Sequence, residues 1–252
     1  MLVAQGIRKR FGGVLALDGV DVAIQPGQVS GLIGRNGSGK STLFNCISGF
    51  LKPSAGQVRV DGRDISAYPP ERIVACGVAR TFQTPRVEPR ATVGDAILCG
   101  FYTKGRSNWL SALAGLPRAV REERRLREAA FLLLERLGLA EFAHVEIGKL
   151  SMGRVRLVEV GRCLAAGSRF LLLDEPAAGL TREEQSVLAE QIRRVAADGA
   201  GVLLVEHNFD LIRALCRDVT VLDEGRVLYA GASAEVARDP RVVAAYLGTA
   251  AA

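Results

Sequence analysis

The chain has 252 residues, of which 48% are hydrophobic and 24% charged, a composition typical of a globular protein with a sizeable core. Its formal net charge of +6 is a modest basic excess that does not by itself indicate a nucleic-acid or membrane ligand. The five cysteines form no CxxC pair, which argues against a disulfide framework or a zinc site and indicates a reducing compartment. We also expect neither a signal peptide nor a membrane-spanning helix, because no apolar run is long enough.

Roughly the first sixty residues have the pattern of β-strands. Val20–Ile24 and Val58–Val60 alternate apolar and polar side chains, as strands with one buried face do. Pro26-Gly27 and Asp61-Gly62 are residue pairs typical of turns. We therefore expect a small antiparallel β region at the N-terminal end of the chain.

A short strand, a glycine-rich loop and a helix are predicted next. The strand covers Val29–Ile33, and the helix begins near Ser41 and ends near Gly49. Between them, Gly34–Ser41 reads G-R-N-G-S-G-K-S and matches the phosphate-binding pattern G-x-x-x-x-G-K-[ST] at every fixed position. We call this segment the phosphate loop.

The composition of the phosphate loop explains what it can bind. Glycines let several backbone N–H groups point at one phosphate, and the N-terminus of the following helix adds the positive end of its dipole. Lys40 is predicted to reach the β- and γ-phosphates of a nucleotide, and the Ser41 hydroxyl to bind Mg²⁺. A chance glycine turn is the alternative, but the flanking strand and helix favour ATP or GTP binding. The other residues predicted to bind the nucleotide here are Asn36, Gly37, Ser38, Gly39 and Thr42.

The middle third of the chain, from about Thr84 to about Gly167, has a helical pattern and contains no convincing strand. Arg118–Leu137 carries apolar residues at helical spacing and is followed by Gly138, a typical helix end. A second helix is predicted after Ser151. We therefore expect a helical subdomain inserted into an α/β core.

Three short apolar runs separated by helical patterns follow: Phe170–Leu173, Val202–Val205 and Val219–Leu222. This alternation predicts a parallel sheet that is buried on both faces. Residues 223–226 predict the turn of a hairpin, after which we expect a short terminal helix.

Polar side chains follow two of these predicted strands. Asp174 and Glu175 come directly after the first, and His207 leaves the second. Because open α/β sheets bind ligands at the carboxyl ends of their strands, we expect these side chains at one edge. Asp174 is predicted to hold the Mg²⁺ shell, and Glu175 to accept a proton from the attacking water. The alternatives are a solvated strand end for the carboxylates and an ordinary surface or core position for the histidine.

In this order, the residues resemble the nucleotide-binding domain of ABC transporters, and the resemblance covers nearly the whole chain. The phosphate loop, extended to Thr42, is similar to the Walker A motif, and the strand before Asp174 to Walker B. Gln83 resembles the Q-loop glutamine, which implies contact with Mg²⁺ or the attacking water. His207 resembles the switch histidine, and Phe11 stands where the family places an aromatic ring against adenine.

Leu150–Arg154 stands where the LSGGQ signature of the family belongs. Ser151 and Gly153 match the signature, whereas Met152 and Arg154 depart from it. The resemblance implies that the serine and the glycine contact the γ-phosphate bound to an opposite subunit, so that two chains enclose two ATP molecules. Ser151 is also predicted to cap the helix that follows it.

Shorter strings resemble one branch, the LivG-type ATP-binding subunits of branched-chain amino acid importers. They are residues 80–83 and 175–180, the long insertion before Arg118, and the ending Ala245–Gly248. This branch implies an ATPase that drives uptake of branched-chain amino acids or a related amide- or urea-like solute, with ATP and Mg²⁺ as cofactors. The implied partners are a second ATPase subunit in a homo- or heterodimer, two transmembrane permease subunits and, indirectly, a periplasmic solute-binding protein, but no nucleic acid. The implied location is the cytoplasmic face of the inner or plasma membrane.

The expected fold is therefore α/β, with a P-loop NTPase core over residues 1–83 and 168–252 and a helical subdomain over residues 84–167. The core combines a mainly parallel sheet with the N-terminal antiparallel β subdomain, and residues 1–252 together form one ABC nucleotide-binding domain.

Two other functions use a similar phosphate loop. A soluble ABC-type protein of translation or DNA repair would associate with nucleic acid, but such proteins usually carry tandem ATPase domains or a long coiled coil. A small-molecule kinase would transfer the phosphoryl group to a metabolite instead of water. It would need an acceptor pocket and would have no use for Ser151 and Gly153 at a signature position.

Overall fold

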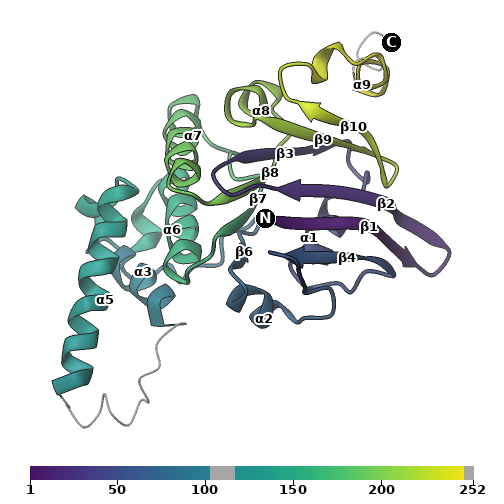
Figure 1. The fold of residues 1–252 in the computed structure, drawn as a ribbon. Helices are drawn as coiled ribbons and strands as arrows, with labels where there is room; N and C mark the ends of the chain where they lie inside the picture. Colours follow the sequence, from purple (N-terminus) through teal and green to yellow (C-terminus); the bar gives the residue numbers. More distant parts are fainter. Residues whose placement is uncertain (103–116, 247–252) are drawn as a thin grey trace. The chain divides into compact units, whose positions relative to one another are not determined.

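The computed structural model describes residues 1–102 and 117–246 (Figure 1). It divides into two compact units, which we describe separately. The first contains Met1–Gln83, Arg169–Ala178 and the chain from Ile192 onward, and the second contains Thr84–Ser168 and Gly179–Gln191. Most of the insertion before Arg118 and the last residues of the Ala245–Gly248 ending lie outside the described residues.

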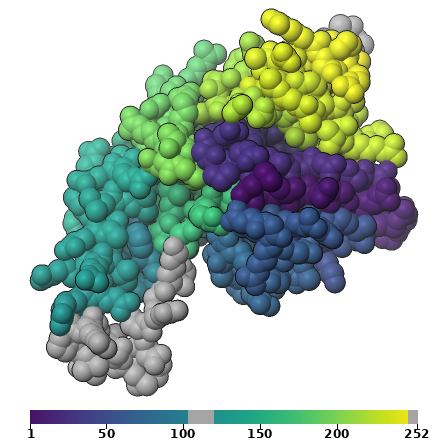
Figure 2. Space-filling view, in the orientation of Figure 1, coloured from purple at the N-terminus to yellow at the C-terminus, as the bar shows by residue number. Residues whose placement is uncertain are grey.

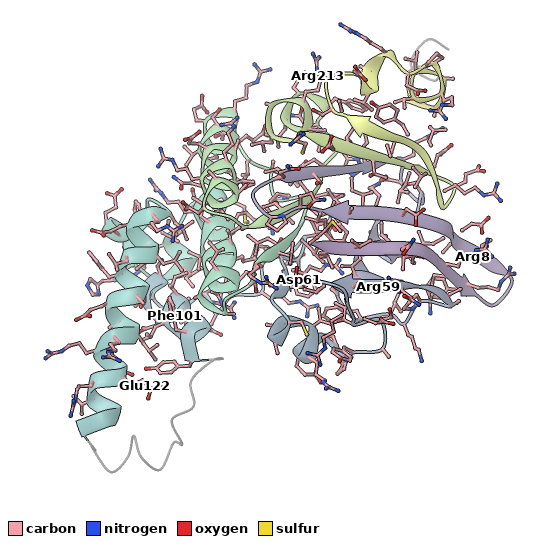
Figure 3. All side chains as sticks on the ribbon, in the orientation of Figure 1. Arg8, Arg59, Asp61, Phe101, Glu122 and Arg213 are labelled. Atoms are coloured by element: carbon pink, nitrogen blue, oxygen red, sulfur yellow. The ribbon has the colours of Figure 1, made fainter. Side chains whose placement is uncertain are left out.

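The first unit contains an antiparallel sheet with the strand order β2-β1-β4-β5. Leu2, Ala4 and Ile7 of β1 are buried, with a shift of register between Ala4 and Ile7, whereas Arg8 on β1 and Arg59 on β4 are exposed and labelled in Figure 3. The strands are β1 (Leu2–Phe11), β2 (Val14–Ile24), β4 (Ala55–Val60) and β5 (Arg63–Asp64).

The second sheet of this unit has the order β10-β9-β3-β8-β7-β6. All neighbouring pairs are parallel except β10 with β9. Its central strands β3 and β8 are buried along their whole length, as expected for a parallel sheet covered on both faces. The predicted α/β fold with a mainly parallel sheet is therefore confirmed. The strands are β3 (Val29–Gly34), β6 (Val78–Arg80), β7 (Phe170–Asp174), β8 (Gly201–Val205), β9 (Asp218–Asp223) and β10 (Arg226–Ala232).

A hydrophobic core joins the two sheets of the first unit through helix α1 (Lys40–Ile47). Leu43 and Phe44 of α1 are buried in one cluster with Leu2 of β1 and Leu172 of β7. In Figure 2 the N-terminal strands, coloured purple, lie between the blue segment that contains β4 and the yellow C-terminal residues. The other helices of this unit are α2 (Pro70–Ala75), α8 (Phe209–Leu215), the 3₁₀ helix η3 (Val236–Arg238) and α9 (Pro240–Tyr246).

The second unit is helical. Gly100 on α3 and Gly161 on α6 permit close helix packing, because a Cβ on Gly100 would lie 2.6 Å from the Ala165 side chain and one on Gly161 would lie 2.5 Å from the Ile97 side chain. Its helices are α3 (Val93–Tyr102), α5 (Pro117–Arg136), α6 (Met152–Ala165), the first part of α7 (Arg182–Ala197), and the 3₁₀ helices η1 (Ala140–Phe142) and η2 (Ile147–Lys149). Within its described residues, the only β pairing is a bridge between Thr92 and Glu146. No helix in the described parts of the chain is both long and apolar enough to cross a membrane.

Candidate active site

The phosphate loop connects the end of β3 to the start of α1. Gly39 occupies the N-cap position of α1 with a left-handed φ of 105°, and no side chain caps the helix there. The loop is held by hydrogen bonds from the Ser38 N–H to the Arg35 carbonyl (3.1 Å) and from the Gly225 N–H to the Ser38 carbonyl (3.0 Å). The first N–H groups of α1 are therefore placed to bind an anion at the positive end of the helix dipole.

Two glycines of the phosphate loop differ in how much space surrounds them. A Cβ on Gly34 would lie 2.2 Å from Ser38 Oγ and 2.6 Å from the Leu222 carbonyl oxygen, closer than any real contact. A Cβ on Gly37 would meet nothing within 4 Å, although its φ of 82° favours glycine. Gly34 is therefore required by packing, whereas Gly37 is required only by its backbone conformation.

This difference predicts unequal effects of alanine. Gly34→Ala is expected to cost about 3 kcal/mol of unfolding free energy, the upper end of typical overpacking, because a backbone oxygen blocks the new methyl group. Gly37→Ala, the matched control, is expected to cost about 1 kcal/mol for the left-handed conformation alone. Denaturant unfolding of the nucleotide-free proteins measures both values, and equal losses in the two variants would contradict this account.

Lys40 is the first residue of α1 and is buried, with 7% of its surface exposed. Its ammonium group donates to the carbonyl oxygens of Gly34 (2.5 Å) and Arg35 (3.0 Å). Burial lowers the pKa of Lys40, and the nearby carboxylates of Glu175 and Asp174 partly oppose this by raising it. The phosphate loop thus places a buried cation near the two carboxylates.

The ends of β7 and β8 lie side by side, because Asp174 pairs with Val205 in parallel register. The Glu175 N–H donates to the Val205 carbonyl at 3.0 Å, so the segments that leave the two strands start together. Asn208 then caps α8 by accepting the N–H groups of Asp210 and Leu211, the second and third residues of the helix, which fixes the chain directly after His207.

Three of the predicted residues meet at the Glu175 carboxylate. Its Oε2 accepts a hydrogen bond from Gln83 Nε2 at 3.1 Å, and its Oε1 lies 2.8 Å from His207 Nε2. Because an ionised carboxylate can only accept, the His207 Nε2–H is the donor in this contact. Gln83 and His207 therefore fix both oxygens of Glu175, the residue predicted to accept a proton from water.

Asp174 has a partly buried cationic partner that the sequence did not reveal. Arg80, the last residue of β6, donates from Nη2 to Asp174 Oδ2 at 2.7 Å and from Nη1 to Asn45 of α1. Its guanidinium lies 5.4 Å from the centroid of the Phe44 ring and 5.3 Å from that of Phe82. An arginine in an otherwise apolar strand was the available signal, since a buried charge requires a partner.

Glu206 is the second residue missed by the sequence analysis. It directly follows β8 and is buried, and its Oε1 accepts the Ala177 N–H at 2.8 Å. Burial raises the pKa of the Glu206 carboxyl above its ordinary value. A carboxylate immediately before His207 was visible in the sequence, but nothing there indicated that it turns inward.

Phe11 ends β1 and is 46% exposed, with the Lys9 ammonium 5.1 Å from the centroid of its ring. Lys9 is not one of the predicted site residues, so this contact does not test the role predicted for Phe11. Stacking of Phe11 against adenine therefore stays a prediction.

The signature segment lies in the second unit, at the start of α6. Ser151 occupies the N-cap position, but its side chain makes no capping hydrogen bond, so the predicted cap is wrong. Its side chain instead bonds to Glu184 and is the largest cause of a lowered pKa of that carboxyl. The Gly153 N–H also points to Glu184, with Oε1 at 3.4 Å. The carboxylate of Glu184 thus competes with the helix for the Ser151 hydroxyl.

Comparisons with known proteins agree with this geometry. The family model described as ABC transporter matches residues 17–178, and a model described as branched-chain amino acid ATP-binding cassette transporter matches residues 230–252. The chain belongs to the ABC transporter family.

Similar proteins match this ABC chain over almost its full length. The high-affinity branched-chain amino acid transport ATP-binding protein BraF of Pseudomonas aeruginosa is 37% identical over 99% of this chain and 98% of its own. The corresponding LivG protein of Escherichia coli K12 is 34% identical with the same coverage. A solved ATP-binding cassette of an ABC transporter in its ADP conformation aligns with a TM-score of 0.85 and 34% identity, over 98% of each chain. As a member of this family, the chain is an ATPase subunit of a transporter.

The donor set of this ABC ATPase fits Mg²⁺. The described residues contain no group of three or more His, Cys, Asp or Glu side chains that could cage a metal ion. Mg²⁺ does not need such a cage, because it commonly takes one or two carboxylates together with substrate phosphates. The carboxylate of Asp174 and the hydroxyl of Ser41, at the start of α1, both offer the oxygen donors that Mg²⁺ prefers.

Proposed function

We propose that the chain is the ATPase motor of an importer for branched-chain amino acids. The observation that carries this proposal is the Glu175 carboxylate, held by Gln83 and His207 at the strand edge and near Lys40 of the phosphate loop. The BraF and LivG relatives, named for branched-chain amino acid transport, support the choice of solute. Related amide- or urea-like solutes are the alternative.

The phosphate loop would bind the triphosphate of ATP. Lys40 would turn one of its donors to the β- and γ-phosphates, while its contacts with the Gly34 and Arg35 carbonyls keep the ammonium in place. Phe11 would stack on the adenine. Backbone N–H groups and side chains would contribute the remaining contacts, from Asn36, Gly37, Ser38, Gly39, Ser41 and Thr42.

Glu175 would accept a proton from the water that attacks the γ-phosphate. Gln83 and His207 orient its carboxylate, and because each carboxylate oxygen can accept more than one hydrogen bond, both contacts can persist when the water binds. Ser41, Asp174 and Gln83 would hold Mg²⁺, which when bound neutralises negative charge on the phosphates. Arg80 orients Asp174, since it is a charged donor at 2.7 Å.

A second ATPase subunit would complete the site. Ser151 and Gly153 of one chain would contact the γ-phosphate bound by the other, in a homodimer or a heterodimer. Two transmembrane permease subunits would join this pair on the cytoplasmic face of the membrane, and a periplasmic binding protein would deliver the solute to them. Nucleic acid would have no part in this assembly.

Uptake by cells of the native host tests the proposed function. Deletion of the chain is expected to reduce uptake of radiolabelled leucine, isoleucine and valine strongly, because the importer would lose the subunit that drives it. The wild-type chain should restore uptake, whereas Lys40→Ala, produced at an equal level by immunoblot, should not. If the deletion left leucine uptake normal but abolished uptake of urea or amides, the proposed solute would be wrong. If it left the uptake of all these compounds unchanged, the proposed importer function would be wrong.

A further inference from the structure

The turn that follows Asp174 has an unusual backbone. Glu175 has a φ of 49°, in the left-handed region that residues with a Cβ rarely adopt. Such a conformation costs on the order of 1–3 kcal/mol and persists only where surrounding contacts impose it. The position of the Glu175 carboxylate depends on this backbone, so the contacts that hold the turn also determine where the carboxylate lies.

Three hydrogen bonds hold the turn. The Glu175 N–H donates to the Val205 carbonyl at 3.0 Å, and the Ala178 N–H donates to the Glu175 carbonyl at 3.2 Å. Both are backbone contacts that any sequence could form. The third comes from a side chain, because the Ala177 N–H donates to Glu206 Oε1 at 2.8 Å.

Glu206 contacts both segments of the active site. Its carboxylate accepts the Ala177 N–H of the turn, and Glu206 itself directly precedes His207 in the chain. One side chain thus connects the turn that carries Glu175 to the segment that carries His207. The side chains of these two residues in turn lie 2.8 Å apart at Glu175 Oε1 and His207 Nε2.

The burial of Glu206 is costly. Only 5% of its surface is exposed, and the Glu175 carboxylate adds to the effect of burial in raising its pKa. A glutamate that only ended a strand would be exposed to water, where its charge costs nothing. The hydrogen bond from the Ala177 N–H is what this inward orientation provides.

We propose that Glu206 is a positioning residue for ATP hydrolysis, which holds the turn after Asp174 so that the Glu175 carboxylate stays within reach of Gln83 and His207. This inference rests on the proposed role of Glu175 as the base that activates water. Glu206 does not touch the phosphate loop in the contacts described above, so it should affect the chemical step and not the binding of ATP.

Two substitutions separate the hydrogen bonds of Glu206 from its charge. Glu206→Gln keeps the acceptor Oε1 and is expected to retain kcat within about threefold, since an equivalent hydrogen bond remains. Glu206→Ala removes the acceptor and is expected to lower kcat about 10- to 100-fold, as misplacement of a catalytic group by an ångström can do. The Kd of ATP from calorimetry should change less than about twofold in both variants. Glu71→Ala, which removes an exposed carboxylate of α2, is the control.

A double-mutant cycle with Glu175→Gln distinguishes positioning from a merely structural role. If Glu206 acts through Glu175, the residual hydrolysis of Glu175→Gln should not fall further when Glu206→Ala is added. Multiplied losses in the double variant would overturn the proposal, as would a normal kcat in Glu206→Ala or a failure of Glu206→Gln to restore it. Loss of ATP affinity together with kcat would assign Glu206 to general stability and also overturn it.

The same cycle separates this inference from the proposed function. Full turnover by Glu175→Gln alone would show that Glu175 is not the base, and it would overturn both the proposed hydrolytic mechanism and the positioning role of Glu206. Loss of turnover in Glu175→Gln combined with full turnover in Glu206→Ala would overturn only the positioning role.

Discussion

Replacement of Glu175 by glutamine is expected to slow ATP hydrolysis about 10²- to 10⁴-fold, the usual contribution of a general base. The amide cannot accept a proton from water at neutral pH, but it has the size of the carboxylate and leaves the phosphate loop untouched. ATP should therefore bind with unchanged affinity and remain intact. Release of inorganic phosphate measures the rate, and calorimetry measures the affinity.

The Glu175→Gln variant should also accumulate as an ATP-bound dimer if two chains enclose the nucleotide. Sedimentation with and without ATP tests this, because an uncleaved triphosphate keeps the contact with Ser151 and Gly153 of the opposite chain. Glu141→Gln, which alters an exposed carboxylate of η1, is the control: it should hydrolyse ATP normally and should not accumulate as an ATP-bound dimer. Full turnover in Glu175→Gln would remove Glu175 from the role of base.

Much of this site could be predicted from the sequence, because its geometry is set by short spacings and by the sheet. The phosphate loop and its flanking strand and helix are adjacent in the sequence, so the prediction of each one supports the prediction of the others. Asp174 and His207 are far apart in the chain, but both leave parallel strands, and the parallel register of β7 and β8 brings their ends together. The alternation of apolar runs and helices was sufficient to predict that sheet.

The residues that orient the site were not predictable in the same way. Arg80 and Asp174 are 94 positions apart, and Glu206 lies 29 positions from Ala177, so their hydrogen bonds depend on the exact tertiary register. The sequence analysis assigned Ser151 to a helix cap, because that is what a serine before a helix usually does. Its hydroxyl instead bonds to Glu184, which reaches it from the start of α7 and accepts the Thr181 N–H at 3.1 Å. A local rule fails where a distant segment supplies a competing charged acceptor.

Lys40→Ala is expected to weaken ATP binding at least about tenfold and up to 100-fold, since a hydrogen bond to a charged group contributes about 1.5–3 kcal/mol and 1.4 kcal/mol is a factor of ten. The loss should be selective for the β- and γ-phosphates, so that AMP affinity changes little. Calorimetry with ATP and AMP measures this selectivity, and Lys52→Ala, at an exposed position, is the control.

Thermal unfolding separates lost binding from lost folding in Lys40→Ala. The substitution removes a buried ammonium whose pKa is lowered by burial, and it also removes two contacts to the loop carbonyls. Because these effects oppose each other, the nucleotide-free variant should melt close to the wild type. A ligand stabilises the native state by RT ln(1 + [L]/Kd), so the rise in Tm caused by a fixed, high ATP concentration should shrink with the logarithm of the lost affinity. If ATP raised the Tm of Lys40→Ala as much as that of the wild type, the phosphate loop would not be the site that holds the triphosphate.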